Sequence, residues 1–345
     1  MLEKVDLTKK ISKEEYKAKM PQMEIELGRL QRECRELKIP VMIVFEGFGA
    51  SGKGVQIGKL IQSMDPRGFQ VFPIKAETED ERMHPFLWRF WTKTPEAGRI
   101  AIFDGSWYRK VLIDRFEKRT REKEIETAFH SIEAFEKQLT DGGTILVKLL
   151  LDIDQKEQKK RFEKLLEKKE TAWRVSQGDR ERNAKYSEYA AMMEEVLYRS
   201  DTKSAPWTVI EATDRRFATV KIYMTVIHAL AEAVEAVQRR RMEEQAIKAA
   251  EQVSGQQEAA EIMRQAGREL ERLQSSVLSR ADLTLAYGKE EYEKRLKKLQ
   301  KKIEKLHGEV YRRRIPVVIG FEGWDAGGKG GAIKRLTEKM DPRGY

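Results

Sequence analysis

Length, composition and charge already limit the kind of protein that these 345 residues can form. Hydrophobic residues make up 40% of the chain and charged residues 36%, which is typical of a soluble, helix-rich protein and excludes a disordered one. The 67 lysines and arginines outnumber the 57 aspartates and glutamates, and the resulting charge of +10 favours polyanionic partners, whether polyphosphate, nucleic acid or an anionic membrane surface.

Cysteine usage and hydropathy indicate a compartment. Cys34 is the single cysteine, so no intrachain disulfide can form, which favours a reducing environment. The first residues contain no apolar segment of signal-peptide length, and no stretch approaches the roughly 18–20 apolar residues of a membrane span. We therefore expect a cytoplasmic protein without a membrane partner.

The hydrophobic pattern predicts alternating helices and strands. Apolar residues from Tyr16 to Leu37 have the spacing of one helix face, with Cys34 among them as a packing thiol. The apolar run VMIVFEG at 41–47 indicates a buried parallel strand. Four further strands are predicted, at 70–74, 99–104, 144–152 and 207–212. Helices between these strands favour an α/β fold with a parallel sheet flanked by helices.

The rest of the chain predicts a long helix and then a repeat. The stretch from Ala218 to Leu273 is charged and alanine-rich, as in a helix. Residues 6–69 then correspond to 282–345 without a gap, an offset of 276 (282 − 6), and both copies contain DLT, KEEY, IPV and MDPRG. We expect a first domain at 1–237, a helical linker at 238–281, and the start of a second, incomplete domain at 282–345.

Each copy carries a glycine-rich loop between a predicted strand and a predicted helix. The loops read FEGFGASGKG at 45–54 and FEGWDAGGKG at 321–330, and both contain the phosphate-cradling pattern G-x-x-x-x-G-K. Glycines let backbone N–H groups converge on phosphate oxygens, and the lysine adds a positive charge. The candidate phosphate-binding residues of the two loops are Gly47, Gly52, Lys53 and Gly54, and Gly323, Gly328, Lys329 and Gly330.

The residue that usually binds Mg²⁺ is missing from both loops. A Ser or Thr normally follows the lysine, but Gly54 and Gly330 stand there, so a metal-bound phosphate needs another oxygen ligand. Asp325 in the second loop can supply it, whereas Gly49 at the equivalent position of the first loop cannot. Asp104 ends a predicted strand at the carboxyl edge of the sheet, where ligands of such sheets bind. Asp104 is the second metal candidate; the alternative is that it only begins the turn DGSW.

Longer motifs resemble a known family. WDAGGKGG at 324–331, DPRG at 341–344, FDGSWY at 103–108 and TAWRVSQGD at 171–179 resemble the type-2 polyphosphate kinases, and the tandem arrangement is similar to that of the two-domain polyphosphate:AMP phosphotransferases. The resemblance implies a thymidylate-kinase-like P-loop kinase fold with a helical lid. It also implies in-line phosphoryl transfer between inorganic polyphosphate and AMP or ADP, with Mg²⁺. We also expect a homo-oligomer.

The resemblance also assigns roles to individual residues. Lys53 and Lys329 match the catalytic loop lysines, and Asp325 and Asp104 match metal-binding aspartates. Lys75 matches a residue that contacts polyphosphate, and three arginines fall in the lid that closes over phosphates: Arg174, Arg180 and Arg182. The first copy departs from the family pattern at Gly49, where the family has Asp, and at Gly105, where it has Arg.

The two departures and the net charge of +10 leave three functional hypotheses. In the first, the chain is a polyphosphate-dependent kinase whose working loop is the second one, and the first copy is a degenerate partner. Restoring Asp at position 49 and Arg at position 105 is then expected to raise the activity of the first domain, provided that the surrounding geometry has not drifted. The second hypothesis is a module that binds polyphosphate or nucleotide without turnover. The third, a nucleic-acid-binding protein, is disfavoured because no zinc, RNA-recognition or helix-turn-helix signature accompanies the charge.

Overall fold

The computed structural model describes residues 2–254 and 282–340, with the backbone alone for 246–254. The chain forms two compact units, Met1–Ala246 and Ile247–Tyr345. Of the linker predicted at 238–281, residues 255–281 lie outside the described residues.

The first unit contains the predicted alternation of strands and helices. Its strands are β1 (Val41–Gly47), β2 (Phe69–Pro73), β3 (Ile100–Asp104), β4 (Ile145–Asp152) and β5 (Trp207–Glu211). Its α-helices are α1 (Lys13–Leu37), α2 (Lys53–Gln62), α3 (Trp88–Trp91), α4 (Ile113–Phe116), α5 (Glu122–Asp141), α6 (Gln155–Leu166), α7 (Lys169–Ala172), α8 (Gln177–Ala184), α9 (Tyr186–Ser200) and most of α10 (Arg215–Ser254), which continues past Ala246. Short 3₁₀ turns cover Leu2–Lys4, Pro66–Gly68, Glu81–Met83 and Trp107–Lys110.

The five strands form one parallel sheet in the order β2-β3-β1-β4-β5, as the alternating pattern predicted. β1 lies at the centre, paired with β3 on one side and β4 on the other, which is why its sequence is apolar and buried throughout. Because the chain leaves β1 toward one side of the sheet and returns to the other, the carboxyl end of β1 is the switch point at which ligands of such sheets bind.

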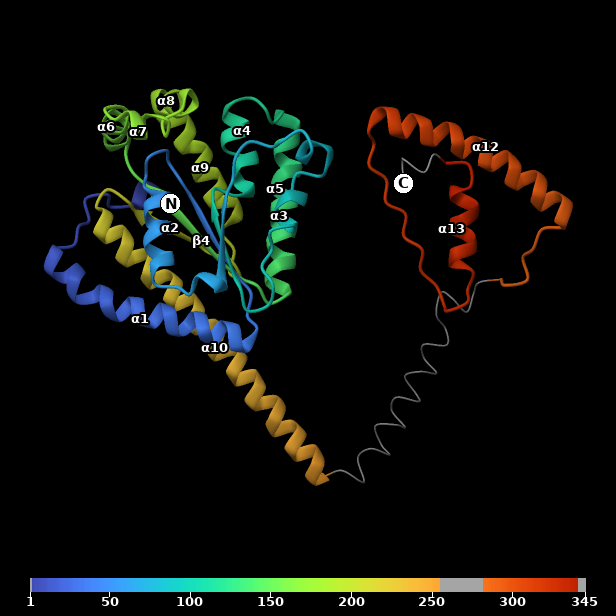
Figure 1. Cartoon of the computed structure of the whole chain (residues 1–345), viewed down its shortest axis with the longest axis horizontal. Helices are drawn as coiled ribbons and strands as arrows, with labels where there is room; N and C mark the ends of the chain where they lie inside the picture. The colour runs from blue at the N-terminus through green and yellow to red at the C-terminus, as the bar shows by residue number, and fades with distance from the viewer. Residues whose placement is uncertain (1, 255–281, 341–345) are drawn as a thin grey trace. The chain divides into compact units, whose positions relative to one another are not determined.

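Helices cover both faces of this sheet. Figure 1 shows α1, α2 and α10 on one face and α3, α4 and α5 on the other, with α6, α7 and α8 gathered beyond one end of the strands. The predicted apolar stripe of α1 is buried, and Cys34 is inaccessible, with its thiol pKa raised to about 12 by burial. The interpretation of Cys34 as a packing residue is therefore confirmed.

One prediction about hydropathy was wrong. The helical segment Arg215–Gln245 is long and apolar enough to cross a membrane by length and composition, although half of its most apolar window is buried inside the first unit. A core helix of a soluble α/β protein can be equally long and apolar, because its inner face packs against the sheet. The absence of a membrane partner stays a prediction.

The second unit contains helices without a sheet among its described residues. α12 (Lys289–Arg313) and α13 (Lys329–Thr337) flank the segment 315–324, which forms no strand there. The sequence predicted a strand at this place without sheet neighbours; no strand forms, because an extended segment needs a hydrogen-bonded partner. Val318 is 97% exposed, whereas its equivalent in β1, Met42, is inaccessible.

We expect the isolated segment 282–345 to show no cooperative unfolding transition. Its apolar residues have no core to enter, and α12 leaves Leu299 and Leu306 exposed. The measurement is thermal unfolding of the 282–345 peptide by circular dichroism, with segment 1–246 as the control. A sigmoidal transition in the peptide would contradict the expectation.

Candidate functional site

The first glycine-rich loop connects β1 to α2 with a backbone that requires glycine at its start. Gly47 has φ +136°, and a Cβ there would lie 2.2 Å from the carbonyl oxygen of Leu151 on β4. Gly52 has φ +106° and caps the amino end of α2, whose first residue is Lys53. The Nζ of Lys53 donates to the Gly47 carbonyl at 2.9 Å, and thereby folds back over the loop. The loop thus presents a helix amino end and a lysine together, which suits a bound phosphate.

A buried arginine that the sequence analysis did not single out holds this loop in place. Arg161 of α6 is 8% exposed and donates to the carbonyls of Ala50 and Ser51 through Nη1, at 3.2 and 3.0 Å. Its Nη2 donates to the carbonyls of Ala212 and Thr213, just after β5, at 2.9 and 3.0 Å. In the sequence, Arg161 is one of several basic residues of QKEQKKRF, a pattern typical of a solvated face.

Asp104 lies beside the first loop, as its place at the end of a strand predicted. In the register of β1 with β3 it lies opposite Phe45, and its Oδ2 is 3.9 Å from the position that a Cβ of Gly54 would take. Glu46, the residue before the loop, accepts a hydrogen bond from Ser106 Oγ at 2.7 Å. Burial raises the pKa of Glu46, while the positive charge of Lys53 acts against that shift. Glu46 was missed, although a carboxylate in an otherwise apolar strand was a signal.

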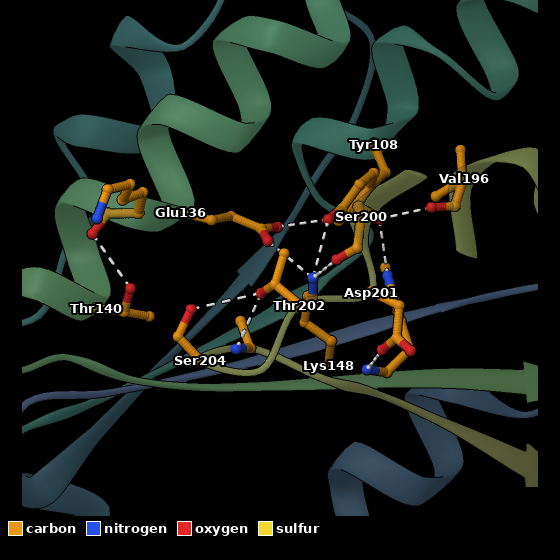
Figure 2. A network of polar contacts seen from close by, with 12 residues as sticks. Tyr108, Glu136, Thr140, Lys148, Val196, Ser200, Asp201, Thr202 and Ser204 are labelled. Atoms are coloured by element: carbon orange, nitrogen blue, oxygen red, sulfur yellow. Dashed lines mark hydrogen bonds and ion pairs between the residues drawn. The ribbon is translucent and has the colours of Figure 1, made fainter. Parts of the chain in front are cut away.

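The turn that follows Asp104 is fixed by a buried ion pair. Trp107 Nε1 and Tyr108 Oη both donate to Glu136 Oε1 of α5, at 2.9 and 2.5 Å. Lys148 of β4, which is inaccessible, donates to Glu136 Oε2 at 2.8 Å and to the carbonyl of Ser200 at 2.6 Å. Figure 2 shows Lys148 pointing between Glu136, Tyr108 and Ser200. The turn is thereby attached to α5, to β4 and to the end of α9.

The remaining predicted site residues of the first unit have different surroundings. Lys75 is exposed and follows Ile74, whose N–H donates to the Asp104 carbonyl at 3.0 Å, so Lys75 begins next to the Asp104 turn. Arg174 and Arg180 are exposed in the segment of α7 and α8, 169–184, which we call the lid. Arg182 differs from them: it is buried and pairs with Glu117 and Asp179 at 2.7 and 2.8 Å.

The second loop repeats the local geometry of the first. Gly323 and Gly328 have φ +155° and +84°, and Lys329 Nζ donates to the Gly323 carbonyl at 2.6 Å. Gly330 follows Lys329 in α13, as Gly54 follows Lys53 in α2. Asp325 is exposed to solvent and Lys329 is half-buried. The described part of the second unit has no sheet around them. The loop conformation is therefore set locally, whereas the rest of the site is not.

Carboxylates beside the first loop are candidate ligands for Mg²⁺. Among the residues whose side chains are described, 2–245 and 282–340, no group of three or more His, Cys, Asp or Glu is placed to hold a metal ion. Mg²⁺ commonly takes one or two carboxylates together with substrate phosphates and water. The Asp104 carboxylate beside the loop, with Glu46 nearby, has the donor chemistry for such a site.

A cavity of the first unit lies away from this loop. It measures about 960 Å³ and is lined at the amino-terminal ends of β4 and β5 and along α10, for example by Ile145, Thr208 and His228. Lys53 and Asp104 lie at the opposite, carboxyl ends of the strands. We therefore place the candidate site by the loop and its charges and not by cavity size.

We expect Asp152→Asn to stabilise the first unit at pH 7. Asp152 ends β4 and is 4% exposed, and burial raises the pKa of its carboxyl to about 6, with Asp154 and Glu211 adding to the shift. A raised carboxyl pKa favours folding below the unfolded pKa, and this stabilisation is lost as pH rises through about 6. The asparagine variant should gain about 2 kcal/mol at pH 7 and almost nothing at pH 4. Urea unfolding at both pH values measures the difference, and equal gains would contradict it.

The chain matches known proteins over most of its length. The family model described as "Polyphosphate kinase 2 (PPK2)" matches residues 10–240 and 286–345. A "Polyphosphate:AMP phosphotransferase" of Pseudomonas syringae pv. tomato is 36% identical over 233 residues, which are 68% of this chain and 47% of that protein. The protein of the same description from Pseudomonas aeruginosa is 35% identical over 67% of this chain and 46% of its own length. The chain therefore spans about half the length of these relatives.

Solved structures have the same architecture. The crystal structure of a polyphosphate kinase 2 from Pseudomonas aeruginosa PA01 superposes with a TM-score of 0.65 at 35% identity, over 68% of this chain and 50% of that one. That of Polyphosphate Kinase 2 from Arthrobacter aurescens TC1 gives 0.64 at 30% identity, over 67% and 85%. The predicted α/β fold with a parallel sheet flanked by helices is confirmed.

Proposed function

This chain belongs to the polyphosphate kinase 2 family, and from that premise we propose that it transfers a phosphoryl group between inorganic polyphosphate and a nucleotide such as AMP or ADP. The observation that carries the proposal is the convergence of Lys53 and Asp104 on a helix amino end at the switch point of the sheet. The relatives whose names contain polyphosphate and AMP support the choice of substrates.

The proposed mechanism needs no covalent intermediate on the protein. The loop N–H groups and Lys53 would hold the phosphate being transferred and balance its charge in line with the attacking oxygen. Ser51 supports this assignment, because its buried hydroxyl in the loop has no hydrogen-bond partner among the described residues. Asp104, with Glu46 nearby, would hold Mg²⁺, which when bound neutralises phosphate charge. The lid arginines Arg174 and Arg180 would approach the polyphosphate chain from outside.

The sequence favoured the second loop as the catalytic one, because it contains Asp325. Among the described residues, however, only the first loop has a sheet around it, an aspartate (Asp104) beside it and a lid over it. We therefore propose that in this chain the first loop holds the phosphate. The cytoplasmic location, the homo-oligomer and the absence of a nucleic-acid partner stay predictions.

A second candidate function is polyphosphate binding without turnover. Two observations favour it: Gly49 provides no carboxylate for a metal, and Gly105 has φ +75°, a conformation in which the family's arginine would be strained. Lys53 and Lys75 would then bind the polyanion without completing the reaction.

We expect Lys53→Ala to lower phosphoryl transfer from polyphosphate to AMP and ADP by about 10²–10³-fold, because one preorganised cation that stabilises transition-state charge is lost. Lys329→Ala is the matched control, since Lys329 has the same loop contacts but no surrounding sheet in the described part of the chain. It should change the rate less than about twofold. The rates are measured with Mg²⁺ on the full chain.

Two other outcomes would contradict these assignments. Wild-type chain that binds polyphosphate but shows no transfer would overturn the enzyme proposal in favour of the binding module. A larger loss in Lys329→Ala than in Lys53→Ala would assign catalysis to the second loop. Binding is measured separately, and its steep decrease with salt is expected for a polyanion held by several cations.

A further inference from the structure

The lid covers Gly49, the position at which the first loop lacks a carboxylate. It is not among the residues with positive φ, so its backbone conformation does not require glycine. A Cβ there would instead lie 2.9 Å from Asp179 Oδ1 of α8 and 3.2 Å from the Phe162 ring of α6. Gln158 of α6 also donates to the Gly49 carbonyl at 3.0 Å. The space that an aspartate side chain would enter is therefore occupied.

A second glycine marks the other contact of the lid. Gly178, in the first turn of α8, also lacks positive φ, and a Cβ there would lie 2.8 Å from Glu117 Oε1 and 3.1 Å from Arg182 Nη1. Glu117 directly follows α4 (Ile113–Phe116). At both glycines an added Cβ would press on the charged side chains that join α8 to its neighbours.

Arg182 links these two contacts. Its Nη1 donates to Glu117 Oε1 at 2.7 Å and its Nη2 donates to Asp179 Oδ1 at 2.8 Å, and its side chain is 9% exposed. Glu117 pairs in addition with Arg119. Burial acts to raise the pKa of Asp179, but hydrogen bonds from Ser176 and the charge of Arg182 outweigh it and lower that pKa. Asp179 is therefore held as a carboxylate, and Arg182 is already paired with anions.

We infer that Glu117, Arg182 and Asp179 form a latch that keeps the lid closed over the first loop until a phosphate polyanion takes Arg182 from its carboxylates. Phosphate oxygens can replace the carboxylates because a guanidinium binds either anion through the same paired N–H groups. The identity of that polyanion rests on the proposed function; the latch itself rests on the contacts above. On this inference an Asp at position 49 would meet Asp179 and displace the lid, instead of restoring the site.

The test is hydrogen–deuterium exchange of the α8 amides, residues 177–184, in the full chain. Glu117→Gln keeps the side-chain shape and removes one charge of the latch, and Gly49→Ala adds the Cβ that meets Asp179. Both should raise exchange in α8 by about tenfold or more. The matched controls are Glu181→Gln, which removes a charge from the exposed face of the same helix, and Gly58→Ala, where a Cβ meets nothing within 4 Å. Both should stay within about twofold of wild type.

A second measurement tests the competition for Arg182. Glu117→Gln should bind inorganic tripolyphosphate several-fold more tightly than wild type, whereas Glu181→Gln should bind it nearly as wild type does. Unchanged α8 exchange in both latch variants would overturn the latch. Raised exchange without tighter binding would overturn the competition. Because exchange is measured without turnover, a failure of the latch is distinguishable from a failure of the proposed reaction.

Discussion

Lys148→Met is expected to destabilise the first unit by about 3–5 kcal/mol, since removing one member of a buried ion pair leaves the other charge without compensation. Lys148 is inaccessible, and burial lowers the pKa of its ammonium, so the charged form depends on Glu136. The substitution also removes the donor to the Ser200 carbonyl. As Figure 2 shows, the contacts of Lys148 that would be lost lie where α5, α9 and the turn after Asp104 meet.

A double-mutant cycle separates the ion pair from the packing around it. Glu136→Gln keeps a carbonyl acceptor for Trp107 and Tyr108 but leaves Lys148 without its counter-charge. The double variant Lys148→Met, Glu136→Gln should be more stable than the sum of the single losses, by about 2 kcal/mol or more. Urea midpoints at a constant m-value give the three differences.

The matched control is another ion pair of α5. Lys137 pairs with Asp141 at 2.8 Å with both side chains largely exposed, so Lys137→Met should cost less than about 0.5 kcal/mol. Additive losses at Lys148 and Glu136, or an effect at Lys137 as large as that at Lys148, would show that the buried pair is not the source of stability.

Arg161→Met is expected to cost about 4 kcal/mol of stability and to weaken polyphosphate binding to the first loop. Five hydrogen bonds are lost: two to carbonyls of the first loop, two to carbonyls just after β5 and one to Glu157 at 2.7 Å. Hydrogen bonds to a charged group contribute about 1.5–3 kcal/mol each, although not additively, and buried carbonyls without donors are unfavourable. The loop would also lose its attachment to the end of β5, and so its preorganised form.

Two variants sharpen this experiment. Arg161→Lys should recover little, because one ammonium cannot span the two turns that the guanidinium bridges. Lys160→Met is the control: Lys160 is the neighbouring residue of α6 and 79% exposed, so its loss should be nearly neutral. Urea unfolding and tripolyphosphate titration are measured on the same preparations. A stable Arg161→Met variant with unchanged affinity would show that the loop holds its shape without the bridge.

Features that depend on local pattern were predictable from the amino-acid sequence alone. The buried apolar run of β1, the four further strands and the α1 stripe were predicted within one or two residues, because hydrophobic period reports which face is buried. The glycine-rich loops were also readable, and both fold alike, although within residues 2–254 and 282–340 only the first has a sheet around it. Asp104 was predicted at the carboxyl end of a strand and is the last residue of β3; its position beside the first loop follows from the pairing of β3 with β1.

Tertiary structure decided what depends on partners from distant segments. Arg161 and Lys148 are basic residues in ordinary patterns, and only the packing of α6 and β4 makes one a bridge for the loop and the other half of a buried ion pair. The strand predicted after α12 does not form, because its apolar pattern cannot supply neighbours. Gly49 appeared in the sequence as a missing carboxylate. The structure adds that Asp179 and Phe162 fill its surroundings, a contact across more than a hundred residues that no local pattern records.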